Sequence, residues 1–136
     1  MPFDKSKIVA KAREYVGTPF HHQGRLKGVG VDCIGLVVCT YRDLELSHKD
    51  SLGYSKFPDG KTLEAGLTQS LDRIPVEEAV PGDVLVFRMR AHPCHIGIKT
   101  DHGVIHTYAG LGKVVEHRID DFWQRRLCAA YRLRGT

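Results

Sequence analysis

The chain has 136 residues, of which 42% are hydrophobic, and a formal net charge of +4. This length and apolar fraction suit one domain, residues 1–136, that buries a core without disulfide bonds. No stretch approaches the ~20 apolar residues needed to cross a bilayer, which argues against a membrane protein. The charged N-terminal segment lacks the apolar centre of a secretory signal, so we expect synthesis in the cytoplasm and a start at or near Met1.

Charge and cysteine content argue against two further classes. The basic residues are scattered except for a cluster within residues 125–134, whereas nucleic-acid-binding proteins usually concentrate them in a denser stripe. We therefore expect no nucleic-acid partner and interpret the cluster as a solvated face. The four cysteines show no CxxC spacing and are expected to be reduced thiols.

The first half of the sequence predicts two helices joined by an irregular loop. Apolar residues recur every four positions from Ile8 to Val16, after Asp4 as the expected cap, and Gly17 ends the helix. Residues 18–32 contain three glycines and a proline without any period, which is typical of a loop that carries functional groups.

The second helix, residues 33–44, begins at the most informative residue of the chain. Asp32 is the expected N-cap, and the apolar run that follows predicts a buried central helix with Cys33 in its first turn. A thiol attacks as the thiolate, and both the positive end of a helix and a neighbouring imidazole lower a thiol's pKa. Cys33 is therefore the candidate nucleophile, although an inert buried thiol is the commoner fate of a cysteine.

The second half of the sequence predicts a short helix and an antiparallel sheet, after a weakly patterned stretch over residues 45–60. Leu63, Leu67 and Leu71 mark the helix. A turn at residues 81–83 then precedes five predicted strands, residues 84–89, 95–100, 104–109, 113–118 and 129–134. Helices followed by antiparallel strands indicate an α+β fold.

The hairpin between the second and third predicted strands places two histidines together. With an even loop centred on residues 101 and 102, the numbers of opposed residues add up to 203, so His95 lies opposite Tyr108. His106 then lies opposite Gly97, and both histidines point to one face, roughly 5 to 8 Å apart at Cβ. Gly97 is expected to leave room for the helix or for a substrate backbone.

This constellation predicts a cysteine-peptidase site. Cys33 is the expected nucleophile, His95 its general base and acid, and His106 the group that orients His95 through the second ring nitrogen. Backbone N–H groups at the helix start would stabilise an oxyanion. Three other histidines in turns or on polar strand faces are expected to be solvated: His48, His102 and His117.

A zinc site is the alternative use of the same histidines. His21 and His22, together with His92, Cys94 and His95, offer the nitrogen and sulfur ligands that zinc prefers. The HPCH segment does not have the ligand spacing of a known zinc loop, so we expect no metal and no cofactor.

Four stretches of the chain, GTPFHHQGRLKGVGVDCIGLV, PGDVLVF, HIGI and VIHTYAG, resemble the NlpC-type cell-wall cysteine peptidases of the papain-like superfamily, most closely their compact phage-associated branch. The resemblance runs from Gly17 to about Trp123, and the ordered combination of motifs is specific. It implies a papain-like fold and Cys33, His95 and His106 as the triad. It also implies hydrolysis of peptidoglycan stem peptides, commonly between the γ-carboxyl of D-glutamate and a diamino acid, with phage tail proteins as possible partners.

Two positions depart from the family pattern. Phe20 stands where the family often has a tyrosine that is thought to assist the oxyanion, and a phenyl ring cannot donate a hydrogen bond. Either the oxyanion hole has one donor fewer or His22 or Gln23 supplies it. Ile34 stands where the family frequently has serine, at a position associated with stem-peptide contact, which leaves the peptide preference open.

Two alternative roles are open for each of three further residues. Asp32 matches a family carboxylate associated with a free stem-peptide amine, and a plain helix cap is an equal alternative. Tyr108 would line the substrate cleft or pack in the core, and Trp123 is interpreted as core in preference to a sugar platform. Two rival functions use the same fold: a non-catalytic phage tail assembly or tip protein, and an amidase or acyltransferase with the same triad.

Overall fold

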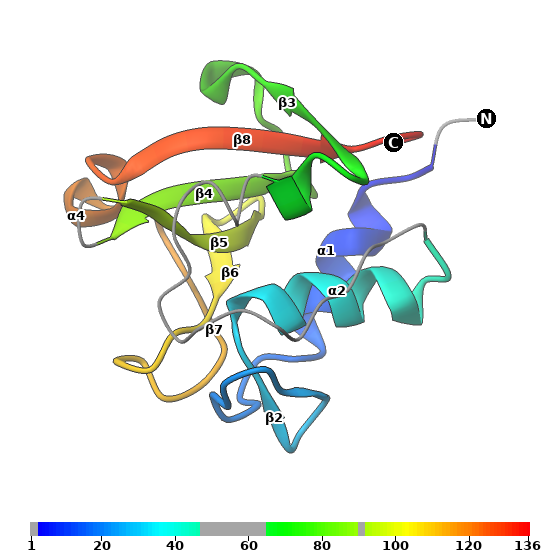
Figure 1. Ribbon diagram of the computed structural model, residues 1–136, viewed down its shortest axis with the longest axis vertical. Helices are drawn as coiled ribbons and strands as arrows, with labels where there is room; N and C mark the ends of the chain where they lie inside the picture. Colours follow the sequence, from blue (N-terminus) through cyan, green and yellow to red (C-terminus); the bar gives the residue numbers. More distant parts are fainter. Residues whose placement is uncertain (1–2, 47–64, 90–91) are drawn as a thin grey trace.

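The computed structural model describes residues 3–46, 65–89 and 92–136, without the side chains of residues 92–94. Helices α1 (Ser6–Arg13) and α2 (Cys33–Asp43) lie together on one side of an antiparallel sheet, as Figure 1 shows. The strand order of this sheet is β3-β8-β4-β5-β6-β7. Its strands are β3 (Leu71–Ile74), β4 (Val84–Met89), β5 (His92–Lys99), β6 (Val104–His106), β7 (Val115–His117) and β8 (Leu127–Leu133). The predicted α+β fold is confirmed.

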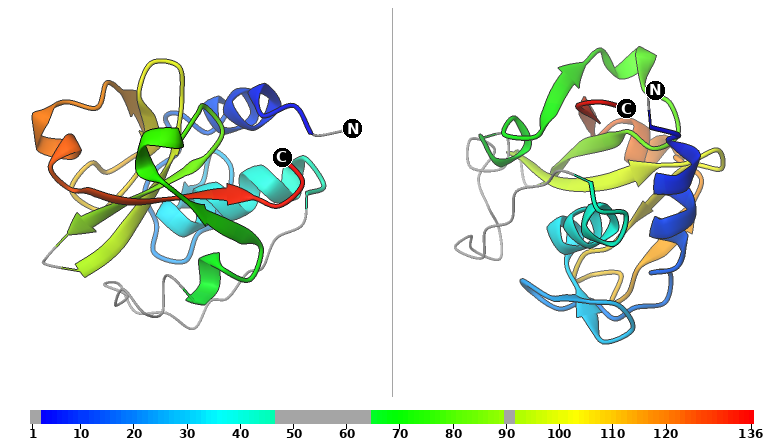
Figure 2. Two further views of the ribbon diagram at one scale, coloured as in Figure 1. Left: turned by 90° about the horizontal axis from the view of Figure 1, so that it is seen from above. Right: turned by 90° about the vertical axis from the view of Figure 1, so that its right-hand side faces the viewer.

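Short elements complete the described chain. The loop after α1 contains a hairpin of two-residue strands, β1 (Arg25–Leu26) and β2 (Gly30–Val31), where the sequence predicted only irregular structure. The 3-10 helix η1 (Val76–Glu78) precedes β4, and α4 (Asp121–Gln124) precedes β8. The two ends of the described chain lie side by side, and the Phe3 N–H donates to the Gly135 carbonyl (Figure 2). No helix of the described part is long and apolar enough to cross a membrane.

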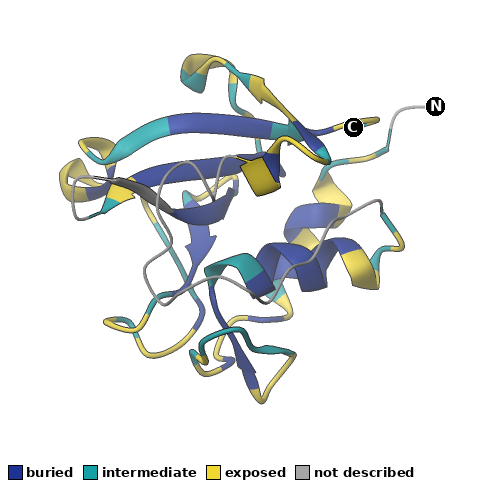
Figure 3. Cartoon of the chain, in the orientation of Figure 1, coloured by how far each residue is buried: buried dark blue, intermediate teal, exposed yellow. Residues whose placement is uncertain are grey.

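The helix that carries Cys33 forms as predicted. Asp32 is its N-cap, and one carboxylate oxygen accepts a hydrogen bond from the Gly35 N–H at 2.7 Å. Seven consecutive residues from Gly35 to Tyr41 are buried, so α2 is the central helix of the core (Figure 3). Cys33 is the first residue inside the helix, the position at which the backbone N–H groups have no helical acceptor.

The first helix ends earlier than predicted. It stops at Arg13, and Gly17 adopts a φ of +93° in the turn that follows. This turn directs Val16 outward, where it is 47% exposed, and buries Tyr15 in its place. Asp4 lies just before the N-cap position, and its carboxylate accepts from the Ser6 N–H.

The sheet has a sixth strand because Leu71 begins β3, where the leucine spacing predicted the end of a helix. Residues 65–67 are helical and Leu67 is buried, while Leu63 lies outside the described residues. Leu71 pairs with Leu133 of β8. The pairing of this edge strand with β8, more than sixty residues away, decided the conformation, and local spacing carries no information about that partner.

The predicted hairpin register is confirmed. Ile98 pairs with Ile105 and Lys99 with Val104, so opposed residue numbers add up to 203 around a turn at residues 101–102. The strands alternate between two apolar clusters. The first, which includes Ile96, Ile98 and Ile105, packs against both helices. The second cluster consists of Leu85, Phe87, Val104, Trp123 and Ala130.

Candidate active site

His95 and His106 meet as the register requires. His95 Nε2 and His106 Nδ1 are 2.7 Å apart, and both side chains are buried, with 3% and 0% of their surface exposed. The predicted contact between His106 and one ring nitrogen of His95 is present. His95 Nδ1 has no hydrogen-bond partner among the described residues, and it is the ring nitrogen available for a thiol.

His117 extends the pair to a row of three histidines. We expected a solvated ring, but His117 is half-buried, and its Nε2 lies 2.6 Å from His106 Nε2. Its Nδ1 lies 2.6 Å from the carbonyl oxygen of Arg118. The sequence held a signal for this contact. In the β6–β7 pairing His106 lies opposite Val115, so His117 is its diagonal neighbour on the same face, but the loop between these strands is too long to reveal that register.

The partners of the three rings determine their tautomers. The Arg118 carbonyl can only accept, so His117 Nδ1 carries a proton and donates it. In neutral His117, Nε2 then accepts from His106 Nε2–H, and His106 Nδ1 in turn accepts from His95 Nε2–H. His95 Nδ1 is left without a proton, which is the state that a general base needs.

Burial keeps the two inner rings neutral. Desolvation lowers the pKa of His95 to about 3, and desolvation together with the neighbouring imidazoles of His95 and His117 lowers the pKa of His106 to about 2. Aromatic rings surround them: His106 meets the edge of Trp123 at 4.6 Å between ring centroids, and Phe87 lies 5.9 Å from His95. Trp123 is buried, as predicted for a core residue.

Tyr108 lies beside His95, with 5.4 Å between the ring centroids in an edge-on arrangement. It is half-buried and also contacts Trp123. The predicted neighbourhood of Tyr108 and His95 is therefore present, and the tyrosine both packs on the aromatic cluster and keeps a surface toward solvent.

Cys33 reaches this region through its helix, because α2 packs against β5, the strand that bears His95. Its side chain is half-buried at the helix N-terminus. The other described thiols have different surroundings. Cys39 is fully buried, which raises its pKa, and Cys128 Sγ lies 3.5 Å from the Val86 carbonyl oxygen. Among the described cysteines, Cys33 alone sits at a helix start.

Asp32 joins the loop before α2 to the helix. Besides capping Gly35, its buried carboxylate accepts from the Gln23 N–H at 2.7 Å and faces Arg25 Nη1 at 3.2 Å. The cap interpretation is confirmed, and the contacts show that Asp32 also holds the loop. Gln23 has a φ of +60°, a left-handed conformation that costs roughly 1–3 kcal/mol and persists only where neighbours hold it.

Two glycines of the motifs are required by close approaches. A Cβ on Gly35 would overlap the Gly24 carbonyl oxygen, so the glycine of the DC-x-G motif lets the loop lie directly on the first turn of α2. A Cβ on Gly97 would lie 2.9 Å from His106 Cβ and 2.7 Å from Val104 Cγ2. The predicted reason for Gly97 is therefore wrong: the space beside it is filled by β6, and it serves the placement of His106.

The candidate oxyanion donors lie in the same loop. His22 and Gln23 are half-buried, and the half-buried Phe20 donates its N–H to the Gly112 carbonyl. The described residues contain no cluster of three side chains suited to a metal. The zinc alternative also involves His92 and Cys94, whose side chains lie outside the described part.

A family model described as the NlpC/P60 family matches residues 17–132. The chain belongs to the NlpC/P60 family. It is 30% identical over 122 residues to the "Probable endopeptidase NlpC" of Escherichia coli K12, covering 86% of this chain and 70% of that protein.

Solved structures of family domains share the fold. The NlpC/p60 domain of the peptidoglycan hydrolase SagA matches with 25% identity and a TM-score of 0.68, over 96% of this chain and all of that domain. RipD of Mycobacterium tuberculosis, described as a non-catalytic NlpC/p60 domain protein adapted to peptidoglycan binding, matches with 14% identity and a TM-score of 0.65 over 97% of each chain. The chain spans 43% of an NLP/P60 family protein of Staphylococcus aureus, with 21% identity and a TM-score of 0.71.

Proposed function

We propose that this protein is a peptidoglycan endopeptidase that cleaves an amide bond of the stem peptide through a thioacyl-enzyme on Cys33. The observation that carries the proposal is the bond from His95 Nε2 to His106, because it leaves the unprotonated Nδ1 of His95 as a base. The proposal adds that Cys33 Sγ approaches this nitrogen during the reaction.

The reaction follows from the two groups. His95 Nδ1 takes the thiol proton, Cys33 Sγ attacks the amide carbon, and His95 returns the proton to the departing amine. Water then attacks the thioester while His95 accepts its proton, the bond from the acyl carbon to Cys33 Sγ breaks, and His95 returns the proton to the sulfur as the free acid leaves. The imidazolium that forms first on His95 is stabilised by the adjacent thiolate, whose charge offsets the desolvation that otherwise keeps His95 neutral.

The oxyanion hole is the second element of the proposal. The N–H groups of Cys33 and Ile34 belong to the first turn of α2, whereas that of Gly35 donates to Asp32. We place the further donor, which the family tyrosine would supply at Phe20, on His22 or Gln23. The close packing of Gly24 on Gly35 supports this, since it brings the loop against the helix start.

The substrate and setting of the proposal follow the family resemblance. The bond proposed is that between the γ-carboxyl of D-glutamate and the diamino acid, and the protein acts at the cell wall. The compact set of motifs favours a phage-associated protein. Its partners would then be proteins of the phage tail, and the tail would carry the protein from the cytoplasm to the wall.

Digestion of defined muropeptides, with product masses read by mass spectrometry, tests this function. The wild type is expected to release the two fragments of the γ-glutamyl bond, and Cys33→Ala to release none. Binding of intact muropeptides by the wild type without any cleavage would instead support a non-catalytic wall-binding or tail protein, for which the fold of RipD provides a precedent. Release of the amino sugar, or transfer of the acyl group to an added amine, would indicate an amidase or an acyltransferase.

A further inference from the structure

We infer that His117 is a positioning residue of the reaction: it sets the direction of the hydrogen bonds along the histidine row and thereby keeps His95 Nδ1 unprotonated. This inference rests on the proposed function, because it describes how the base of that reaction is prepared.

The three rings form a continuous chain of hydrogen bonds. Successive nitrogen–nitrogen distances are 2.7 Å from His95 to His106 and 2.6 Å from His106 to His117, and the last ring is 2.6 Å from the Arg118 carbonyl oxygen. Trp123 packs edge-on against His106 and lies 5.9 Å from His117 by ring centroids, so it limits rotation of both rings.

The direction of the row depends on its outer end. A carbonyl oxygen is only an acceptor, and this fixes His117 Nδ1–H and leaves Nε2 as an acceptor in the neutral ring. If His117 Nε2 carried a proton instead, His106 would accept from it and donate to His95 Nε2. His95 would then hold its proton on Nδ1 and could not take one from a thiol.

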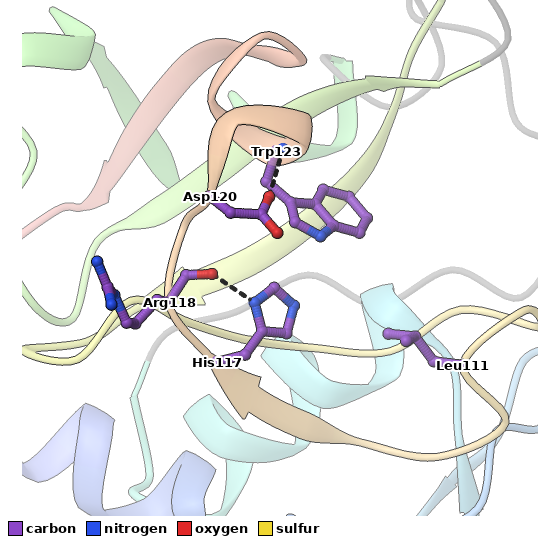
Figure 4. Close-up of a pocket in the computed structure, with 5 residues that line it drawn as sticks. All are labelled: Leu111, His117, Arg118, Asp120 and Trp123. Atoms are coloured by element: carbon purple, nitrogen blue, oxygen red, sulfur yellow. Dashed lines mark hydrogen bonds between the residues drawn. The ribbon is translucent and has the colours of Figure 1, made fainter.

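The outer end of the row opens to solvent. His117 is half-buried and lines a surface pocket with Leu111, Arg118, Asp120 and Trp123, and Figure 4 shows its ring hydrogen-bonded to the Arg118 carbonyl. Among the described residues, the titratable or charged residues that contact His117 or share its pocket are His106 on β6, Arg118 on its own segment and Asp120 before α4. Asp120 accepts from the Trp123 N–H and is therefore held in place.

A proton can be relayed along this row in balanced steps. The thiol proton moves to His95 Nδ1, the His95 Nε2 proton to His106 Nδ1, and the His106 Nε2 proton to His117 Nε2. The net change is a thiolate at Cys33 and a protonated His117, with both inner rings neutral again. This places the positive charge on the ring that water reaches, whereas burial disfavours charge on the inner two.

The test compares two replacements of His117 in the full chain. His117→Gln keeps an acceptor near the position of Nε2 but cannot be protonated in this range, and His117→Leu removes the acceptor. The matched control is His102→Leu, since His102 is 72% exposed and lies outside the row. Iodoacetamide modification of Cys33, followed by mass spectrometry of its peptide between pH 5 and 9, is measured beside kcat/KM on a muropeptide and thermal unfolding.

We expect His117→Leu to lower kcat/KM and the alkylation rate of Cys33 about tenfold to a hundredfold, as outer partners of functional histidines typically do. His117→Gln should recover most of this loss because its carboxamide oxygen still accepts a hydrogen bond, and its pH profile should differ from that of the wild type because the row then ends on a group that takes up no proton. The control should match the wild type.

Failures of the two ideas are distinguishable. An alkylation rate of Cys33 and a pH profile in His117→Leu equal to those of the wild type would overturn the role of His117 while leaving the proposed peptidase intact. Equal losses in both variants with an unchanged pH profile would overturn it as well, because they indicate packing alone. An unreactive Cys33 in the wild type would instead overturn the peptidase itself.

Discussion

Two polar networks on the same sheet, the Asp83–Arg132 ion pair and the histidine row, differ in how they respond to burial: the first stays charged and the second stays neutral. Asp83, 1% exposed, accepts from Arg132 Nε at 3.1 Å and from Arg132 Nη2 at 2.9 Å, and also from the Val80 N–H. The carboxylate raises the pKa of Arg132, so this network retains its charges. The histidine row is kept neutral by burial. A fixed ion pair can hold a turn, whereas a neutral row of rings can change its protonation during a reaction.

The largest expected effect is the loss of activity on replacement of His106, which belongs to the histidine row and not to the ion pair. His106→Ala should lower kcat about ten-thousandfold, similar to the loss of an orienting group in a serine-protease triad. Because Nδ1 is the nitrogen that faces His95, His106→Asn should retain more activity than His106→Gln: the asparagine oxygen reaches the same distance from the backbone. Steady-state kinetics with unfolding curves test this, and three equally mild losses would remove His106 from the site.

Replacement of the Asp83–Arg132 ion pair should have the opposite effect: it should lower stability and leave catalytic activity unchanged. Arg132→Ala leaves the buried Asp83 carboxylate without its cationic partner and with the Val80 N–H still donating to it, and the loss of one partner of a buried pair typically costs about 3–5 kcal/mol of unfolding free energy. Urea denaturation measures this, with Asp72→Asn, the exposed partner of Arg134, as a control expected to cost less than about 1 kcal/mol. If kcat/KM of Arg132→Ala, corrected for the fraction of folded protein, also fell, the ion pair would contribute to the reaction as well as to stability, which would contradict this prediction.

The loop at the start of α2 provides an intermediate effect. Loss of one oxyanion donor typically lowers kcat about a hundredfold to a thousandfold. If the side chain of His22 or Gln23 is that donor, kcat should fall by such a factor in His22→Ala or in Gln23→Gly, respectively. Glycine is the better replacement at Gln23 because it adopts the positive φ without strain. Phe20→Tyr should leave turnover equal or higher. Unchanged rates in both loop variants would mean that backbone groups suffice.

The smallest effect, taken over a single pH unit, is the pH dependence of stability from the histidine row. An unfolded histidine takes up a proton below its ordinary pKa near 6.5, whereas folded His95 does so only near 3. The unfolded state therefore gains protons first, and stability falls as the pH drops from about 6.5 toward 3, by up to about 1.4 kcal/mol per pH unit for each such histidine. Urea unfolding at a series of pH values should show a shallower decline for His95→Leu and an unchanged one for His102→Gln.

Local patterns predicted the parts of the site that local geometry controls. The cap at Asp32, the helix beginning at Cys33 and the register that joins His95 to His106 all depend on a few adjacent residues or one tight turn. His117 was missed because the longer loop before β7 does not specify which residues of β6 and β7 pair. Arg132 was interpreted as solvated because its partner Asp83 lies 49 positions away, and only the completed sheet brings them together.

The central claim, that the neutral histidine row prepares a base for Cys33, is tested most directly by alkylation rates within one sample. Iodoacetamide modification near pH 6.5, resolved by mass spectrometry, should be much faster at Cys33 than at Cys128, which is also half-buried, and His95→Ala should remove this difference. Equal rates at these two cysteines in the wild type, or an unchanged rate at Cys33 in His95→Ala, would contradict the claim.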